Sequence, residues 1–250
     1  MAGGRTPAIL VPVMATGAIR VLVLWDIDYT LIATGAGSRA AFDAAVESVA
    51  GRHPGAHDVH FFGKTDPEIA LEILGAMAII GPEAAEHLPR ILRALEDQLE
   101  VAVDALRASG GVLPGVEPVL RWLAAEPAVL QTVLTGNVEA NARLKLRVFG
   151  LDGWFDFECG AYGSDHADRE RLVPVAVEKA ERIRGARPSR VWVVGDTARD
   201  LACARAGGAR CLLVATGRAP LEELRAAGAD AVLPDLTDTE NVVRLLLDEE

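Results

Sequence analysis

Short apolar runs that end in polar residues constrain the fold of this chain more than any other feature. The first run, Val21–Trp25, reads VLVLW and is followed directly by Asp26. Five apolar residues are too few for a helix and are typical of a strand with both faces buried, as in a parallel sheet. The sequence therefore predicts an α/β fold built on a doubly wound, Rossmann-like parallel sheet.

The C-terminal half continues this pattern as an alternation of strands and helices. We expect further strands at Val129–Leu134, near Phe155–Cys159, and at Val191–Val194, Cys211–Val214 and Ala231–Leu233. Helical spacing of apolar residues predicts helices at Pro114–Ala125, Val138–Phe149, Val173–Ile183, Leu201–Ala206 and Pro220–Ala227. Ligands of such sheets bind beyond the carboxyl ends of the strands, so the polar residues that directly follow the apolar runs are the functional candidates.

The region between the first two strands has helical periodicity and little β pattern. Its predicted helical segments are Ser38–Val49, Pro67–Ile80 and Pro82–Ala108. We predict a small all-helical domain at residues 35–110, inserted into an α/β core made of residues 1–34 and 111–250. Small residues at Ala33–Gly37 and Ser109–Gly111 would serve as two hinges between these parts.

The charge of the chain limits its partners. It has 36 acidic and 25 basic side chains in 250 residues, a formal net charge of −11. Because such a surface repels phosphate backbones and anionic lipids, we expect neither nucleic acid nor a membrane as partner. A monomer and a homodimer are both compatible with the sequence.

The cysteine pattern and the N-terminus bear on location. The three cysteines form no CxxC pair, which predicts neither a zinc site nor a disulfide framework and fits a reducing cytoplasm. No window reaches the roughly 18 uninterrupted apolar residues of a membrane span. Residues 1–18 are interpreted as an N-terminal tail. We therefore expect a cytoplasmic protein.

Four acidic residues are expected to converge at the carboxyl edge of the sheet. Asp26 and Asp28 follow the first strand, and Asp196 and Asp200 follow the strand Val191–Val194. Without a counter-ion these carboxylates would repel one another strongly, and a divalent cation resolves that repulsion. Oxygen ligands suit Mg²⁺, so all four residues are candidate Mg²⁺ ligands.

These residue types fit phosphoryl transfer. Asp26 would attack phosphorus and form an aspartyl-phosphate, while Asp28 would protonate the departing oxygen and then take a proton from the attacking water. Hydroxyl, backbone amide and guanidinium groups would bind the phosphoryl oxygens. The candidates for that role are Thr135, Gly136, Asn137, Arg169 and Arg171.

In this order, the residues resemble the four motifs of the haloacid dehalogenase superfamily. Those motifs are Asp-x-Asp-x-Thr after the first strand, a Thr or Ser after the second, a Lys or Arg further on, and an acidic Gly-Asp-x-x-x-Asp. The resemblance runs from Val21 to the C-terminus. It implies that the helical insert is the family's small cap, which closes over the site and selects the substrate. It also implies that the loop Gly63–Asp66 enters the active site, as in phosphoglycolate phosphatase-like members, with Lys64 as a substrate contact.

Two positions depart from the family pattern. Tyr29 stands where Gly is usual, which places a bulky ring at the mouth of the site. The third motif is usually Lys-Pro, whereas this chain has two arginines in the segment His166–Arg171. Counting back from Asp196 favours Arg171, while the variants that contain an Asp-Arg pair favour Arg169, which we rank slightly higher.

The resemblance implies a Mg²⁺-dependent phosphatase that hydrolyses a small phosphomonoester through an aspartyl-phosphate. The expected partner is therefore a small phosphorylated metabolite, with a phosphoglycolate-like compound or a sugar phosphate as the leading substrate. A sugar phosphomutase of the β-phosphoglucomutase type shares the core motifs and is the enzymatic alternative. A protein that binds a phosphorylated ligand on the same scaffold without turnover is a third possibility, because a fold alone does not determine function.

Overall fold

Six parallel strands form the central sheet of the computed structural model, which describes residues 19–34 and 37–248. The strand order is β5-β4-β1-β6-β7-β8. The strands are β1 (Val21–Trp25), β4 (Val129–Thr135), β5 (Ala161–Tyr162), β6 (Arg190–Gly195), β7 (Arg210–Val214) and β8 (Ala231–Leu233). The chain builds outward from β1 to β4 and β5 and then returns to the other side of β1, so β1 lies at the point where the strand order reverses.

Alternate residues of β1 supply the two halves of the core. Val21, Val23 and Trp25 join the apolar cluster on one face of the sheet, and Leu22 and Leu24 join the cluster on the other. Helices cover both faces, which explains why β1 is continuously apolar. The first face packs against α5 (Val116–Ala124), α6 (Glu139–Val148) and α10 (Thr239–Leu247), and the second against α7 (Leu172–Arg184), α8 (Ala198–Ala206) and α9 (Leu221–Ala226).

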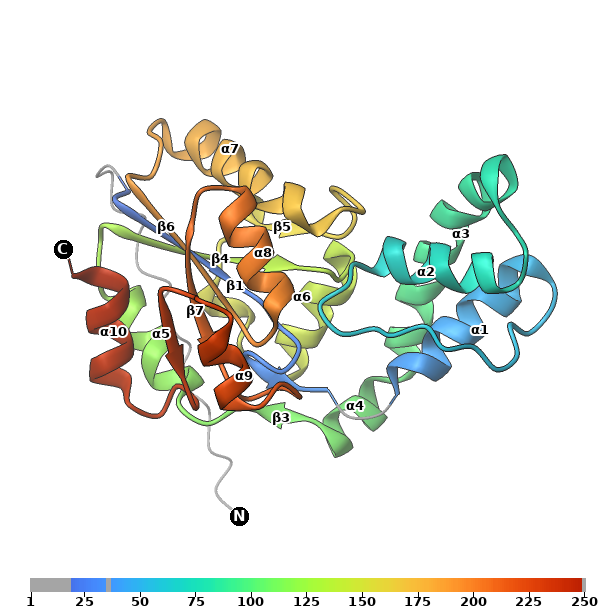
Figure 1. The fold of residues 1–250 in the computed structure, drawn as a ribbon, viewed down its shortest axis with the longest axis horizontal. Helices are drawn as coiled ribbons and strands as arrows, with labels where there is room; N and C mark the ends of the chain where they lie inside the picture. The colour runs from blue at the N-terminus through green and yellow to red at the C-terminus, as the bar shows by residue number, and fades with distance from the viewer. Residues whose placement is uncertain (1–18, 35–36, 249–250) are drawn as a thin grey trace, which may run out of the picture.

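The predicted helical insert follows β1 and lies to one side of the sheet (Figure 1). It consists of α1 (Ser38–Ala50), α2 (Asp66–Ala76), α3 (Gly81–Val101) and α4 (Val103–Ser109). It has its own apolar cluster, in which Phe42, Ile73 and Ile91 are buried. We call α1–α4 and the loops between them the cap. The domain boundaries at residues 34 and 111 stay a prediction.

The two connections between cap and core meet in a short antiparallel ribbon that the sequence pattern did not indicate. In it, β2 (Ile32–Ala33) pairs with β3 (Gly111–Val112). Two residues of the expected hinge at Ala33–Gly37, 35 and 36, lie outside the described residues. The expected N-terminal tail, residues 1–18, lies wholly outside them. No helix within residues 19–34 and 37–248 is both long and apolar enough to cross a membrane.

The strand expected near Phe155–Cys159 is wrong. The 3-10 turn η1 (Asp152–Trp154) precedes that segment, a second one, η2 (Phe157–Cys159), lies within it, and the pairing strand β5 begins two residues after it. The Asp156 side chain accepts a hydrogen bond from the Glu158 backbone N–H and fixes the η2 turn. The apolar side chains that suggested a strand instead pack into the core.

The other differences between the predicted and the observed elements lie mainly in where a helix begins or ends. The helix expected over Pro67–Ile80 stops at Ala76, because Ala78 adopts a left-handed backbone with φ of 62°. The helix expected over Pro82–Ala108 is divided at Ala102 into α3 and α4. The helix expected at Leu201 begins at Ala198, because Thr197 and Asp200 form a reciprocal capping box.

Packing of α5 against the sheet provides a test of the fold. Leu120 is fully buried in the core, whereas the adjacent Arg121 is exposed. We expect Leu120→Ala to lower the free energy of unfolding by about 2–5 kcal/mol, because it leaves a cavity in a close-packed cluster. Arg121→Ala, on the same helix, should change it by less than about 0.5 kcal/mol. Urea denaturation measures both, and equal losses would contradict this packing.

Candidate active site

The register of three adjacent strands brings the expected motif residues to one edge of the sheet. Trp25 of β1 lies opposite Val133 of β4 and Val194 of β6. Asp26 therefore follows β1 beside the ends of both neighbours, and its backbone N–H donates to the Val194 carbonyl at 2.9 Å. Thr135 ends β4 and Asp196 directly follows β6, so all three polar residues meet at the carboxyl edge.

Three of the four expected carboxylates form a buried cluster. One carboxylate oxygen each from Asp26, Asp196 and Asp200 lies within 4.8 Å of the others. Burial, followed by repulsion from Asp200 and Asp26, raises the pKa of Asp196 to about 9. Burial raises the pKa of Asp26 to about 7, against the opposing effect of Arg169. Burial is the main cause of both shifts, and repulsion from the neighbouring carboxylates adds to it.

The two arginines of the third segment lie in different surroundings. Arg169 is buried, and its Nη2 donates to Asp26 Oδ1 at 3.0 Å and to the Asp200 carboxylate. Arg171 is exposed and contacts Asp168 at 3.8 Å. Both belong to a single 3-10 turn, η3 (Arg169–Arg171), which directs one side chain inward and the other outward. Only Arg169 is therefore placed to meet a ligand at the acidic cluster.

Asp28 does not join this cluster. Both of its carboxylate oxygens accept hydrogen bonds from Lys145 Nζ at 2.8 Å, and Oδ2 also accepts one from Asn137 Nδ2 at 2.7 Å. Burial would raise the pKa of Asp28, but the Lys145 ammonium and these hydrogen bonds outweigh it and hold the pKa below its usual value. Any contact of Asp28 with a metal held by the cluster would then come from its backbone, since its carboxylate is already bound.

Lys145 is a site residue that the sequence reasoning missed. It lies on α6, 117 residues after Asp28, and its ammonium also donates to Asn137 Oδ1 at 2.7 Å. No local motif marks it. A lysine on the inner face of a helix that follows a functional strand end was the only available signal, and only the packing of α6 identifies that face.

The expected phosphate-binding turn is well ordered by hydrogen bonds. The Thr135 hydroxyl accepts one from Asn137 Nδ2 at 2.8 Å and a longer one from the Asn137 backbone N–H at 3.3 Å. Gly136 lies directly against the backbone carbonyl of Lys64, and a Cβ at this position would collide with it. The turn therefore needs glycine for a close approach of two backbones.

The loop Gly63–Asp66 reaches from the cap into the site, as expected. The Asp66 backbone N–H donates to the Gly136 carbonyl at 2.7 Å, and Asp66 Oδ2 accepts from the Val138 N–H at 2.8 Å. Burial raises the pKa of Asp66 to about 6. The Thr65 hydroxyl donates to the Ala167 carbonyl at 2.6 Å. Asp66 thus joins cap to core, a role that the sequence reasoning did not assign to it.

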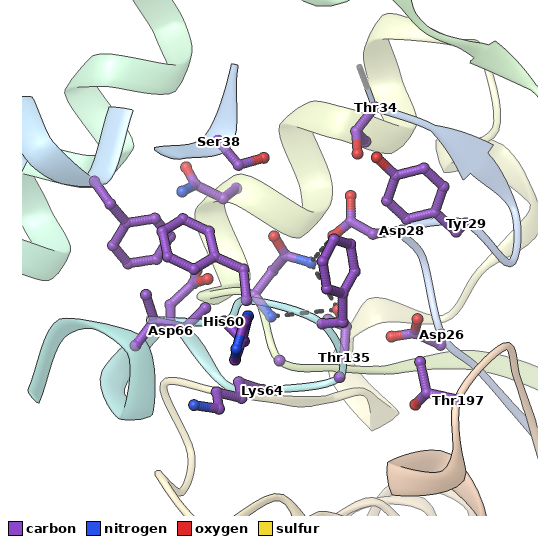
Figure 2. A pocket seen from close by; sticks show the side chains of 18 of the residues that line it. Asp26, Asp28, Tyr29, Thr34, Ser38, His60, Lys64, Asp66, Thr135 and Thr197 are labelled. Carbon is purple, nitrogen blue, oxygen red and sulfur yellow. Dashed lines mark hydrogen bonds between the residues drawn. The ribbon is translucent and has the colours of Figure 1, made fainter. Parts of the chain in front are cut away.

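A cavity of about 450 Å³ lies between this loop, the cap helices and the strand ends. Asp26, Asp28, Thr135 and Asn137 line its core side, and Lys64 and Asp66 line its cap side. Figure 2 shows Asp26 beside Thr197 at one end of the cavity, with Lys64, His60 and Asp66 at the other. The Lys64 ammonium is bound to the Glu72 carboxylate.

The cavity mouth carries Tyr29, the residue that stands in place of the usual glycine. Its backbone has φ of 63°, in the left-handed region that favours glycine and costs other residues about 1–2 kcal/mol. The Thr216 hydroxyl donates to the Tyr29 carbonyl at 2.6 Å and helps to hold this conformation. The Tyr29 ring lies 6.3 Å from that of Phe62, so two aromatic rings border the mouth.

Comparison with known proteins agrees with this geometry. Residues 23–205 match the model of the family described as haloacid dehalogenase-like hydrolase. The chain is 26% identical over 226 residues to the probable phosphatase IndB of Dickeya dadantii, which covers 90% of this chain and 94% of that protein. It is 25% identical over 225 residues to a phosphoglycolate phosphatase of Pseudomonas putida, which covers 88% of this chain and 78% of that protein.

Solved structures share the fold. A hydrolase from Pseudomonas syringae superposes with a TM-score of 0.64 at 21% identity, over 92% of this chain and all of that chain. The family match spans most of the chain and includes the strand ends that carry Asp26, Thr135 and Asp196. The chain therefore belongs to the haloacid dehalogenase-like hydrolase family.

Proposed function

We propose that this protein is a Mg²⁺-dependent phosphatase that hydrolyses a small phosphomonoester through an aspartyl-phosphate on Asp26. The observation that carries the proposal is the buried cluster of Asp26, Asp196 and Asp200, with Arg169 bound to two of its members. Such a cluster at the switch point of a parallel sheet suits a cation and a phosphoryl group better than a structural role. The phosphatase names of two relatives agree with it.

The donor set fits Mg²⁺. It consists only of carboxylate oxygens, two from residues that directly follow adjacent strands and one from the first turn of α8, and these are ligands that Mg²⁺ prefers. Burial, with a smaller contribution from the neighbouring carboxylates, raises the pKa of Asp26 and of Asp196 in the absence of an ion. Asp26, Asp196 and Asp200 would hold the ion, with the Asp28 backbone as a further ligand. A bound Mg²⁺ supplies charge neutralisation and orients a phosphoryl oxygen.

The first half of the proposed reaction belongs to Asp26. A carboxylate oxygen of Asp26 forms a bond to phosphorus while the bond from phosphorus to the alcohol oxygen breaks. The Thr135 hydroxyl, the Gly136–Asn137 backbone and the Arg169 guanidinium hold the phosphoryl oxygens. Arg169 stays charged, since the carboxylates of Asp200 and Asp26 raise its pKa against the effect of burial. The departing alcohol oxygen takes a proton from Asp28.

The second half returns the enzyme to its starting state. Water attacks the phosphorus of the aspartyl-phosphate, loses a proton to Asp28 and displaces the Asp26 carboxylate, so that inorganic phosphate is released. The ion pair with Lys145 favours the ionised form of Asp28, which is the form that this second step requires. The first step requires the protonated form, so Asp28 must take up a proton against the ion pair with Lys145 before the alcohol leaves.

We expect Asp26→Asn to lower kcat by a factor of about 10⁴ or more, because an amide cannot form the acyl phosphate. Release of inorganic phosphate from a phosphomonoester, followed by ³¹P NMR, measures this loss and separates hydrolysis from a mutase reaction. Circular dichroism checks that the fold is retained. Undiminished phosphate release by the folded variant would refute the proposal.

The acid role of Asp28 makes a second prediction. Asp28→Asn should slow hydrolysis of an alkyl phosphate by about 100-fold or more, because an alkoxide needs a proton to leave. Hydrolysis of p-nitrophenyl phosphate should slow much less, because nitrophenolate leaves without one. Steady-state kinetics on both esters test this difference. Equal losses would remove Asp28 from the acid role.

The acidic cluster predicts a pH-dependent stability in the absence of metal. The folded-state pKa of Asp196 is about 9, above its ordinary value of 3.8, so the folded protein binds more protons than the unfolded chain between these values. The free energy of unfolding should therefore fall as the pH rises through this range. Urea denaturation in EDTA measures the slope, which should be shallower in Asp196→Asn.

Asp196→Asn also tests whether the acidic cluster binds Mg²⁺. At pH 8, Mg²⁺ at about 100 times its Kd should stabilise the wild-type protein by about 2.7 kcal/mol. Asp196→Asn should respond much less, since it lacks one of the proposed ligands. Equal stabilisation of both proteins by Mg²⁺ would place the ion elsewhere.

A further inference from the structure

The cap side of the cavity is mainly apolar. Its wall comes from α1, from the loop before α2, and from α2 and α3. Its apolar lining residues include Phe42, Val59, Phe61, Ile69, Leu95 and Leu99, most of which also belong to the apolar cluster of the cap. Phe42 and Phe61 pack edge to face with ring centroids 5.1 Å apart, which gives the wall an aromatic centre. We call these six residues the apolar wall.

The cap cations at the cavity are already bound to other groups. Lys64 is bound to the Glu72 carboxylate. Arg39 donates to the Val59 carbonyl at 2.8 Å and to the His57 carbonyl at 3.2 Å, and its guanidinium lies 5.0 Å from the centroid of the Phe61 ring. A carboxylate on the leaving group, as in a glycolate, would have to displace one of these contacts.

The cap side offers few buried polar groups to a sugar. Ser38 and His60 line it but are exposed, so a sugar would gain there only what water already provides. On the core side Thr34 and Thr197 line the cavity, and the buried Asn141 has an Oδ1 with no hydrogen-bond partner among the described residues. These groups are a small complement for a polyol, because each hydroxyl group that loses water needs a replacement partner.

Arg218 differs from Lys64 and Arg39, because its guanidinium contacts an aromatic ring and is not bound to a carboxylate or a cap carbonyl among the described residues. It lines the cavity and is exposed. Its guanidinium lies 3.9 Å from the centroid of the Phe62 ring, which in turn lies 6.3 Å from the Tyr29 ring. Arg218 is therefore the cation whose removal tests for a carboxylate on the substrate.

From this arrangement we infer that the substrate is a phosphomonoester of a small alcohol with an apolar alkyl or aryl body. The phosphoryl group would lie at Asp26, and the body of the alcohol would pack on the apolar wall. A cavity of about 450 Å³ is large enough for such a molecule. The inference rests on the proposed phosphatase function and narrows the expected substrate from phosphoglycolate or a sugar phosphate to an apolar ester.

Three alkyl phosphates that all release an alcohol test the inference: 2-phenylethyl phosphate, 2-phosphoglycolate and glucose 6-phosphate. With the full chain and Mg²⁺, kcat/KM for 2-phenylethyl phosphate should exceed the other two by about tenfold or more, because apolar burial distinguishes the esters. Higher kcat/KM for phosphoglycolate or glucose 6-phosphate would overturn the inference and leave the phosphatase function intact. If neither these esters nor p-nitrophenyl phosphate were hydrolysed, the proposed function would fail, and this inference with it.

Matched variants on α3 locate the contact. Leu99 belongs to the apolar wall, whereas Val101, two residues later, is 85% exposed and does not line the cavity. Leu99→Gln should lower kcat/KM for 2-phenylethyl phosphate by about tenfold, and Val101→Gln should change it by less than about twofold. Thermal unfolding checks that both variants are folded. Equal effects of the two substitutions would show that the wall does not bind the alcohol.

Arg218→Ala tests the alternative that a carboxylate on the substrate determines selectivity. If the variant selectively loses activity on 2-phosphoglycolate, and that ester is the better substrate of the wild-type protein, a carboxylate rather than an apolar group defines the substrate and the inference is wrong. If 2-phenylethyl phosphate stays the better substrate in both proteins, the apolar wall is supported as the selective surface.

Discussion

The repulsion among three buried carboxylates is the constraint on which the rest of the site depends. Asp26 and Asp196 reach the same point because β1 and β6 are parallel and their register brings their carboxyl ends together, and Asp200 joins them from the first turn of α8. Such a cluster is costly unless a cation compensates it. Arg169 supplies part of that charge through its contacts with Asp26 and Asp200.

A second charged pair, between Asp28 and Lys145, is separate from this cluster although Asp28 is only two residues from Asp26. Two nearby carboxyl groups therefore have pKa values shifted in opposite directions: the pKa of Asp26 is raised and that of Asp28 is lowered. Without a cation these shifts are opposite to the proposed roles, because a nucleophile must be ionised and an acid protonated; a bound cation would lower the pKa of Asp26. Asn137 connects the Asp28–Lys145 pair to the turn at Thr135.

The cap contributes in two ways. Its loop at Asp66 is bonded to the same turn, Gly136–Val138, that is expected to hold the phosphoryl oxygens, so the position of the cap and the order of the turn are physically linked. Its helices supply the apolar wall. Family membership thus concerns mainly the chemistry at the strand ends, whereas the alcohol must be inferred from the side chains of this particular cap.

The sequence by itself determined the parallel sheet, the helical insert and the residues at the strand ends, because apolar periodicity and strand ends are local patterns. It misplaced β5, since the apolar side chains of Phe155–Cys159 enter the core from turns, and it left open which arginine faces the acids. Tertiary structure alone decided that Arg169 points inward, that Lys145 pairs with Asp28, and that Asp66 joins cap to core. Each of these contacts joins residues at least 70 positions apart, and the packing of whole elements, which no local spacing encodes, brings them together.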